Sequence, residues 1–304
     1  MEQWYKFQPE EYLEATRQSF LADDYAPVIA KRCGIQDYGC ILEVGCGTGA
    51  FSRYIAQCVE NAKFIGLDKD PELINYYNRF QWDTINTFSG IIGDAYELPF
   101  EEGVFDAVCS HTFLTCVPHP HKVMKEMMRV CKAGGIVSSI TAMSWQPEIF
   151  DAGSYPGDSR EWIHRFWELY RHMYAGYYEQ FQGMSMAQGV QPNKVPAFFK
   201  ECGLEAVSVL AVGRAFSLSD AGMSREQKER YISNFYLGEQ KKARYLSEYN
   251  QKQEVISEKT IQEFLDYLRR WKIFWLDHVD DNSIWEWWGG TQLLTTGKKA
   301  RLEI

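Results

Sequence analysis

Short apolar runs and stretches of helical periodicity alternate along the first half of the chain. Residues 40–44, 64–67, 105–110 and 136–140 are apolar runs of strand length, and residues 120–131 have a helical pattern. Strands that alternate with helices in this way are typical of a parallel sheet covered by its own crossover helices. The pattern therefore predicts an α/β fold.

Aromatic residues dominate the helical pattern that follows the fifth predicted strand. Trp162, Phe166, Tyr170, Tyr174 and Tyr178 recur at four-residue spacing. A helix with this spacing buries one broad aromatic face. We expect core packing to explain most of this face, and part of it to line a ligand pocket.

Two further predicted strands flank a long charged stretch in the second half. Residues 206–210 and 291–296 are the strand-like runs, and residues 224–279 are helical in pattern and highly charged. A helical insertion between two strands can provide dimer contacts or extend a pocket wall, and the sequence does not choose between these roles.

A glycine turn directly after the first strand is the most informative local feature. Gly45, Gly47 and Gly49 follow an apolar run that contains Glu43. Glycines adopt positive φ and let the backbone approach a ligand closely, so the turn predicts a nucleotide-cofactor site. Gly45, Gly47 and Ala50 also satisfy the dinucleotide fingerprint, so the turn alone leaves the cofactor open.

The motifs that follow the turn separate these cofactors. Asp68, at the end of the second apolar run, can accept both hydroxyls of a cofactor ribose, a role that nicotinamide enzymes and methyltransferases share. The next motifs are more specific. Residues 91–100 read IIGDAYELPF, residues 105–108 read FDAV, and a Gly-Gly turn at 134–135 precedes the fifth strand.

In this order and spacing, the motifs resemble those of the S-adenosylmethionine-dependent methyltransferases of the Rossmann-like class. The resemblance covers residues 38–142 closely and extends loosely to the late strands. It implies an α/β fold with a seven-stranded, mostly parallel sheet, an antiparallel last strand, a helical N-terminal lid, and helical insertions after strands 5 and 6. It also implies that the protein is a methyltransferase with S-adenosyl-L-methionine as its cofactor.

The resemblance places each cofactor contact at a strand end. Glu43 would lie near the amino-acid end of the cofactor, Asp68 would bind the ribose hydroxyls, and Asp94 would bind the adenine amino group. Asp68 and Asp94 could instead cap the helices that follow them. Asp106 stands at the start of its strand and is expected to be structural. The expected cofactor-binding residues are Glu43, Gly45, Cys46, Gly47, Asp68, Lys69, Asp94, Ala95 and Ser110.

The methyl acceptor is less specifically indicated. His111 directly follows the fourth strand and would act as a general base, or it would only shape the pocket or contact the cofactor. The N/D-P-P-Y tetrad of amide and exocyclic-amine methylation does not occur there, because residues 110–113 read SHTF. We therefore expect a small-molecule acceptor, methylated at oxygen, nitrogen or carbon. The expected acceptor-binding residues are Tyr5, Tyr12, Trp162, Phe166 and Tyr170.

These features divide the chain into four parts. Residues 1–37 would form the lid, and residues 38–144 and 192–304 would form the methyltransferase core. Residues 145–191 would form the aromatic helical insertion, and residues 220–288 a second helical insertion within the core. A homodimer is compatible with such insertions.

Composition and charge narrow the function classes further. The net charge of -9 and the pI near 5.3 argue against a nucleic-acid partner, which normally meets a basic face. No apolar run approaches the roughly 18 residues of a membrane span, and no secretion signal is evident. The eight cysteines form no C-x-x-C pair, which suits a reduced, cytoplasmic protein without a metal site. Two alternatives remain: a non-catalytic S-adenosylmethionine-binding protein of the same fold and, less favoured, an NAD-dependent oxidoreductase.

Overall fold

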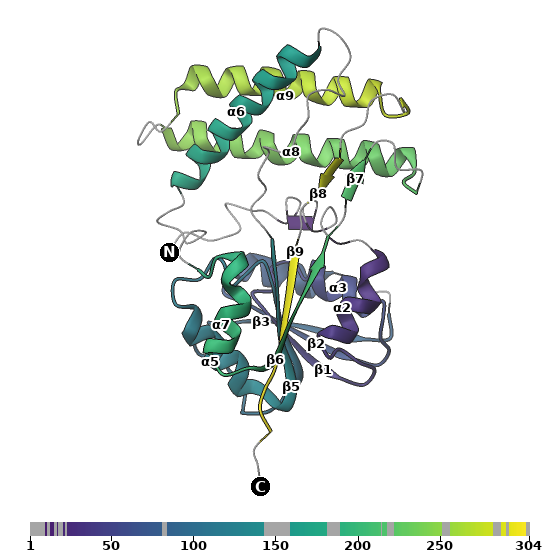
Figure 1. Cartoon of the computed structure of the whole chain (residues 1–304), viewed down its shortest axis with the longest axis vertical. Helices are drawn as coiled ribbons and strands as arrows, with labels where there is room; N and C mark the ends of the chain where they lie inside the picture. The colour runs from purple at the N-terminus through teal and green to yellow at the C-terminus, as the bar shows by residue number, and fades with distance from the viewer. Residues whose placement is uncertain are drawn as a thin grey trace. The chain divides into compact units, whose positions relative to one another are not determined.

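The computed structural model divides the chain into two compact units (Figure 1). The sheet unit comprises Met1–Ser144, Ser185–Arg214 and Gly290–Ile304, and the helical unit comprises Trp145–Met184 and Ala215–Gly289. Residues of both predicted insertions fall within the helical unit. The structure describes residues 10, 13–14, 17, 21, 23–80, 84–142, 159–180, 189–213, 215–217, 222–250, 256–281, 287–289 and 292–301.

Seven strands of the described sheet unit form one mixed sheet in the order β3-β2-β1-β4-β5-β9-β6. The first five strands pair in parallel, and β9 runs antiparallel to both of its neighbours, β5 and β6. This confirms the predicted mostly parallel sheet with an antiparallel last strand. The strands are β1 (Cys40–Val44), β2 (Lys63–Asp68), β3 (Thr87–Ile92), β4 (Phe105–His111), β5 (Cys131–Ala142), β6 (Glu205–Val212) and β9 (Gln292–Lys298).

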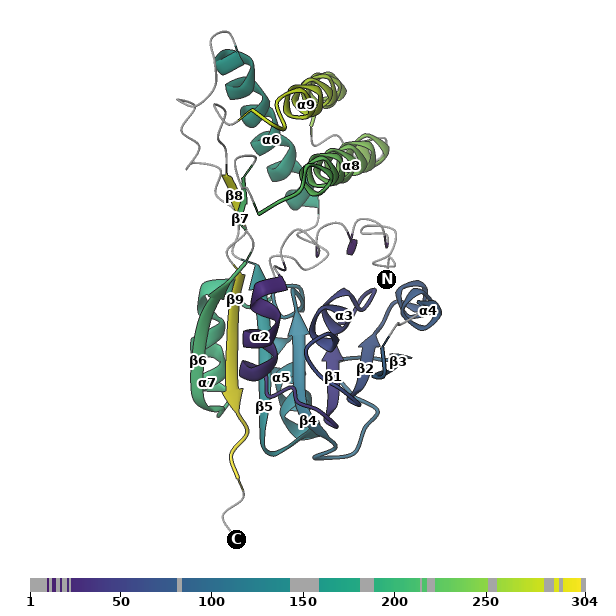
Figure 2. The same cartoon turned by 90° about the vertical axis from the view of Figure 1, so that its right-hand side faces the viewer.

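Helices cover both faces of this sheet (Figure 2). On one face, Ile29 of α2 and Ile55 of α3 share a buried cluster with Ile41 of β1. On the other face, Met127 of α5 and Phe199 of α7 belong to a second cluster. The helical elements are η2 (Asp23–Tyr25), α2 (Ala26–Arg32), α3 (Ala50–Ala56), α4 (Pro71–Arg79), α5 (Pro120–Val130), η6 (Pro192–Lys194) and α7 (Val195–Glu201).

The start of α4 shows how local sequence sets the carboxyl edge of the sheet. Pro71 is the first helical residue, where a missing N–H costs no hydrogen bond. Asp70 caps the helix, because its Oδ1 accepts the Glu72 N–H at 3.0 Å. Because α4 begins at Pro71, only Lys69 and Asp70 separate it from the end of β2 at Asp68. This short connection keeps Asp68 at the edge of the sheet.

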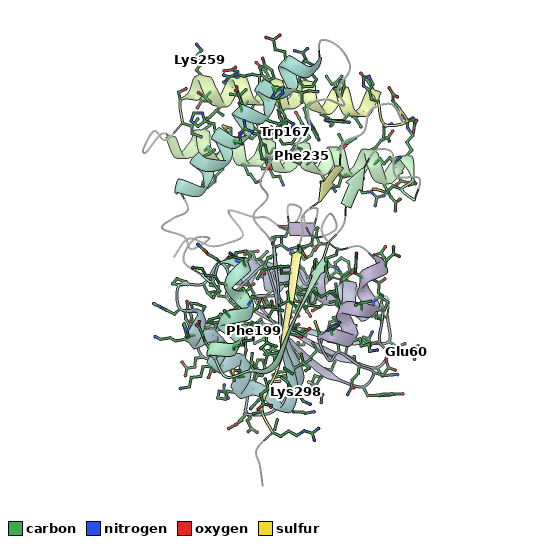
Figure 3. The ribbon with its side chains drawn as sticks, in the orientation of Figure 1. Glu60, Trp167, Phe199, Phe235, Lys259 and Lys298 are labelled. Atoms are coloured by element: carbon green, nitrogen blue, oxygen red, sulfur yellow. The ribbon has the colours of Figure 1, made fainter. Side chains whose placement is uncertain are left out.

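In the helical unit, α6 (Ser159–Gln180), α8 (Arg225–Asn250) and α9 (Glu258–Asp277) pack through aromatic side chains. The Phe166 ring on α6 lies 6.0 Å from Phe264 and 5.9 Å from Trp271, both on α9. The Phe235 ring on α8 lies 4.6 Å from Trp271. Figure 3 shows Phe235 and Trp167 among these side chains. Trp162, Phe166 and Tyr170 of the predicted aromatic face are thus part of the core of this unit, while the side chains of Tyr174 and Tyr178 lie outside the described part.

A two-stranded antiparallel ribbon joins the ends of the segment that carries α8 and α9. It pairs β7 (Ala215–Ser217) with β8 (Trp287–Gly289), so that Ser217 lies opposite Trp287. The sequence did not predict this ribbon, since strands of three residues carry too little periodicity to be recognised.

Candidate cofactor and active site

The glycine turn between β1 and α3 is held by the end of β2. Gly45, Gly47 and Gly49 have φ of 71°, 54° and 80°, in the left-handed region that favours glycine. The Gly45 N–H donates to the Leu67 carbonyl at 2.8 Å, and the Gly47 N–H donates to Asp68 Oδ2 at 2.9 Å. The turn is therefore a fixed loop at the edge where open α/β sheets bind ligands.

Asp68 ends β2 and keeps acceptor capacity for a ligand. Its Oδ1 accepts the Asp70 N–H at 3.0 Å, while its Oδ2 accepts the Gly47 N–H. A carboxylate offers about four lone-pair sites, so each oxygen keeps one for another donor. Burial raises the pKa of Asp68, and the two backbone N–H groups oppose that shift. Lys69 follows it as an exposed residue.

Asp94 and Ala95 lie just beyond the end of β3. Asp94 is exposed, and its Oδ1 accepts the Tyr96 N–H at 2.9 Å. Ala95 is partly buried and packs against the hydrophobic cluster on the face of the sheet that α5 and α7 cover. Asp68 pairs with Ile92 in the register of β2 and β3, so both expected carboxylates stand at neighbouring strand ends.

Glu43 is buried behind the glycine turn and faces the first turn of α3. Its Oε2 accepts the Ser52 hydroxyl at 2.5 Å and the Ser52 N–H at 3.2 Å. Burial raises the pKa of Glu43 to about 7, while the hydrogen bonds from Ser52 and the charges of Arg53 and Arg17 oppose this. A cationic group beside Glu43 would therefore shift it to the ionised form.

The side chains of Cys46 and Ser110 are engaged within the protein. Cys46 packs with Ile74 and Tyr77. The Ser110 hydroxyl donates to the Ser139 hydroxyl oxygen at 3.0 Å. A cofactor contact from either residue would therefore come from its backbone, and their predicted role stays a prediction.

His111 is the last residue of β4 and is 5% exposed. Its ring stacks on Phe51 with centroids 5.4 Å apart, and its Nε2 lies 3.3 Å from Gln292 Oε1. Burial lowers the pKa of His111 to about 3, the nearby charge of Arg17 adds to this, and the contact with Gln292 opposes it. The imidazole is thus neutral and weakly basic, which favours pocket shaping over general-base catalysis.

The loop after β4 packs over the glycine turn. A Cβ atom at Gly45 would lie 2.2 Å from Phe113 Cδ2, so the Phe113 ring occupies the space that glycine leaves. Thr112 has φ of 52°, a strained value of the kind that clusters at functional sites. The Thr112 hydroxyl oxygen accepts a hydrogen bond from Arg17 Nη2 at 2.7 Å.

The described positions of the N-terminal segment contact the same edge. Leu13 Cδ1 lies 3.6 Å from the place that a Cβ at Gly47 would take. Glu14 forms an ion pair with Arg53 of α3. Together with the bond from Arg17, these contacts fall where the lid was predicted. The predicted range 1–37 also includes α2, which packs in the core on one face of the sheet, so the lid stays a prediction.

The expected acceptor-binding residues fall in different parts of the chain. Tyr5 and Tyr12 lie outside the described residues. Trp162, Phe166 and Tyr170 are buried on α6, where their rings contact aromatic side chains of α8 and α9. These contacts explain their burial within the helical unit, and a role in binding the acceptor stays a prediction.

Sequence reasoning missed Arg17 and Gln292. Gln292 is the first residue of β9, and an antiparallel strand begins at the edge where its parallel neighbours end. A polar residue at the start of the predicted last strand was therefore a usable signal. Arg17 had no comparable signal, because its place depends on how the N-terminal segment folds back.

Asp106 lies at the start of β4, away from this edge. Its Oδ2 accepts the Cys40 N–H at 2.9 Å, and its Oδ1 pairs with Lys132 Nζ at 2.6 Å. Partial burial tends to raise the pKa of Asp106, but the hydrogen bonds from Lys132 and the Cys40 N–H, with the charge of Lys132, lower it overall. These contacts support the predicted structural role.

The described residues hold neither a candidate metal site nor a candidate membrane-spanning helix. Within them, no group of three or more His, Cys, Asp or Glu side chains could hold a metal ion. None of their helices has the length and apolar character that crossing a membrane requires.

Comparisons with known proteins point to one family. Residues 42–139 match the family described as a methyltransferase domain. The demethylmenaquinone methyltransferase of Oceanobacillus iheyensis is 37% identical over 112 residues, which cover 36% of this chain and 47% of that protein. The demethylmenaquinone methyltransferase of Bacillus pumilus is 29% identical over 184 residues, which cover 59% of this chain and 76% of that protein. Several relatives are matched over only about a third to a half of their own length.

A solved structure gives a more distant likeness. Phosphoethanolamine N-methyltransferase 2 of Haemonchus contortus, in complex with S-adenosyl-L-methionine, aligns with 16% identity over 91% of this chain and 53% of that chain. The TM-score is 0.47, too low to inform the site. The family match and the motifs that line one edge of a sheet of order β3-β2-β1-β4-β5-β9-β6 lead to one assignment. Residues 42–139 therefore form a methyltransferase domain, and the chain is similar to the S-adenosylmethionine-dependent methyltransferases of the Rossmann-like class, whose cofactor is S-adenosyl-L-methionine.

Proposed function

We propose that this protein transfers a methyl group from S-adenosyl-L-methionine to a small-molecule acceptor. The observation that carries the proposal is the glycine turn of Gly45, Gly47 and Gly49, which are all left-handed. Gly45 and Gly47 donate hydrogen bonds to the end of β2. Such a turn presents backbone rather than side chains to a ligand.

The described residues fit this cofactor. Gly47 has no side chain, and Leu13 Cδ1 lies 3.6 Å from the position that a Cβ atom there would take. The space beside the Gly47 backbone is thus open to a ligand. Asp68 keeps one lone pair on each oxygen for the two ribose hydroxyls, and Asp94 keeps acceptor capacity for the adenine amino group. Glu43 offers a carboxyl group for the cationic amino end. When bound, the cofactor supplies an activated methyl group on a positively charged sulfur.

Three observations support a small acceptor. The loop after β4 carries His111, Thr112 and Phe113 in place of the tetrad that serves amide and exocyclic-amine methylation. The demethylmenaquinone methyltransferases among the relatives are named for a small-molecule acceptor. The net charge of -9 disfavours a polyanionic partner. A reduced, cytoplasmic location also stays part of this proposal, since none of the eight cysteines forms a disulfide.

A matched pair of glycine variants tests the cofactor site. Gly47→Val should abolish binding of S-adenosylhomocysteine, because the side chain would enter ligand space. Gly203→Val is the control: Gly203 also has positive φ, of 89°, no atom lies within 4 Å of its Cβ position, and it precedes β6 at the opposite edge of the sheet. Both variants carry a similar backbone strain of roughly 1–3 kcal/mol.

Isothermal titration calorimetry with S-adenosylhomocysteine separates the outcomes. We expect the Gly203 variant to bind like the wild type and the Gly47 variant not to bind. If the wild type does not bind, or if Gly47→Val binds normally, the methyltransferase proposal is wrong. If the wild type binds S-adenosylhomocysteine as expected, its release during turnover with an acceptor distinguishes an enzyme from a non-catalytic binding protein.

A further inference from the structure

Gln292 is a buried amide with an unused hydrogen-bonding atom. Its side chain is 0% exposed, and its Nε2 has no hydrogen-bond partner among the described residues. A buried amide that lacks a partner has lost its hydrogen bonds to water without replacing them, which destabilises the fold. Such an unpartnered group in a native structure calls for an explanation, and a bound ligand that completes its hydrogen bonds is one.

The amide stands at the ligand-binding edge of the sheet. Gln292 begins β9 and pairs with Ala142 at the end of β5 and Val212 at the end of β6. Its Oε1 contacts Nε2 of His111, the last residue of β4. If the amide oxygen and nitrogen were exchanged, the contact with His111 would still use one amide atom and leave the other. One polar atom of Gln292 is thus left for a ligand in either orientation.

Arg17 brings positive charge to the same place. Its guanidinium bonds the Thr112 hydroxyl, one residue beyond His111. Its positive charge adds to the burial that lowers the pKa of His111, and it opposes the burial that raises the pKa of Glu43 and of Cys116. A guanidinium has five N–H donors, and Arg is well suited to bind oxyanions.

The weak basicity of His111 restricts which acceptors can react. An imidazole with a pKa of about 3 removes a proton poorly from a neutral alcohol or phenol. An acceptor that arrives ionised needs no such base. The charge of Arg17 favours that ionised form, because an opposite charge nearby stabilises it.

We propose that the acceptor carries an anionic oxygen, which Arg17 and the side-chain amide of Gln292 bind beside His111. This inference rests on the proposed methyl transfer and narrows its substrate class to phenolates, enolates and carboxylates. The ionised oxygen forms the new bond to the methyl carbon with its own electron pair. The bonding pair of the broken carbon–sulfur bond stays on sulfur. Gln292 and Arg17 are thus specificity-determining residues.

Four probes that share one ring test the charge preference. They are 4-nitrophenolate and 4-nitrobenzoate as two kinds of oxyanion, nitrobenzene as the neutral reference, and 4-nitrobenzylamine as the cation. Binding of each to the wild-type protein, saturated with S-adenosylhomocysteine, is measured by ligand-observed NMR at a pH where the phenol is ionised. We expect at least one anion to bind about tenfold or more tightly than nitrobenzene and the amine. The anion that binds better distinguishes a phenolate from a carboxylate acceptor.

Two variants assign the preference to these residues. Gln292→Met keeps the side-chain volume and removes the amide, and Arg17→Met removes the charge. Each should lower the affinity for the preferred anion about tenfold while S-adenosylhomocysteine affinity changes less than about twofold, and Arg17→Lys should recover part of the loss. Arg32→Met is the control, since Arg32 is an exposed cation on α2 that bonds Ser208 away from the edge. If Gln292→Met does not fold, Arg17→Met still tests the charge.

The outcomes separate this inference from the proposed function. Failure of the wild type to bind S-adenosylhomocysteine would overturn the methyltransferase proposal and this inference with it. Normal binding of S-adenosylhomocysteine with no preference for either anion, or with tighter binding of the amine, would overturn this inference alone. Unchanged anion affinity in Arg17→Met would also overturn it.

Discussion

Replacement of Asp68 by alanine offers the sharpest test of the cofactor geometry. In the folded protein, each carboxylate oxygen of Asp68 accepts one backbone N–H, from Asp70 and from Gly47. Two of about four lone-pair sites remain, which matches the two hydroxyls of a ribose. The variant would therefore lose both the ribose acceptors and the tether of the glycine turn.

The expected loss follows from the strength of hydrogen bonds to a charged group. A charge-assisted hydrogen bond contributes about 1.5–3 kcal/mol. Because water can bond the released ribose hydroxyls in the variant, we expect the loss of the pair to weaken cofactor binding by about 1.5–3 kcal/mol in total. At 1.4 kcal/mol per tenfold, this corresponds to a dissociation constant raised about 10- to 150-fold.

Calorimetry with two ligands separates ribose contact from loop tethering. The wild type and Asp68→Ala are each titrated with S-adenosylhomocysteine and with its 2′-deoxy analogue. If Asp68 binds the ribose, removal of the 2′-hydroxyl weakens binding to the wild type and has little effect on the variant. Equal penalties in both proteins would mean that Asp68 acts only through the glycine turn.

Asp70→Ala is the matched control for the same loop. Asp70 caps α4 through the Glu72 N–H, so its loss should cost about 0.5–2 kcal/mol of stability. Affinity for S-adenosylhomocysteine should change little. Unchanged affinity in Asp68→Ala, or an equal loss in Asp70→Ala, would refute the assignment of Asp68 to the ribose.

The remaining predictions concern three other parts of the structure. Burial raises the pKa of Glu43 to about 7, so the folded protein keeps a proton that the unfolded chain releases near pH 4.5. The free energy of unfolding should therefore fall by roughly 3 kcal/mol as the pH rises from 4.5 to above 7. Urea titrations should show this decline flattened in Glu43→Gln, and an unaltered decline would assign it to other groups. His111→Ala should lower methyl transfer more than S-adenosylhomocysteine affinity once an acceptor is known, and equal losses would point to a cofactor role. Phe166→Ala should cost about 3–5 kcal/mol in chemical denaturation, because the ring is fully buried against Phe264 and Trp271, while S-adenosylhomocysteine affinity should stay unchanged. A loss of affinity without a loss of stability would instead place Phe166 in a ligand site.

The sequence predicted the sheet well because its strands are short apolar runs with distinct boundaries. The sites of Glu43 and Asp68 followed from the same runs, since parallel strands bring their carboxyl ends to one edge. The structure brings both residues to the glycine turn, with Ser52 and Gly47 as their hydrogen-bond partners. What the sequence could not supply was the burial that shifts the pKa of Glu43 and His111.

Contacts between distant segments escaped prediction for a physical reason. Arg17 and Gln292 meet the end of β4 only because the N-terminal segment folds back and β9 enters between β5 and β6. Neither event leaves a local period in the sequence. The aromatic spacing on α6 predicted a buried face correctly, but spacing alone does not identify the partner helices α8 and α9.

The place of β9 also has a consequence for how the chain folds. Synthesis produces β6 before its sheet neighbour β9, so β6 must wait without a strand partner while the segment that carries α8 and α9 is made. Closing so long a loop costs chain entropy and slows strand pairing. The β7–β8 ribbon lowers that cost, because pairing of Ser217 with Trp287 brings the two flanks together a few residues from Val212 and Gln292. Early formation of the ribbon would thus guide the last strand into the sheet. It would shorten the time during which β6 has no strand partner and β5 is an open edge prone to association.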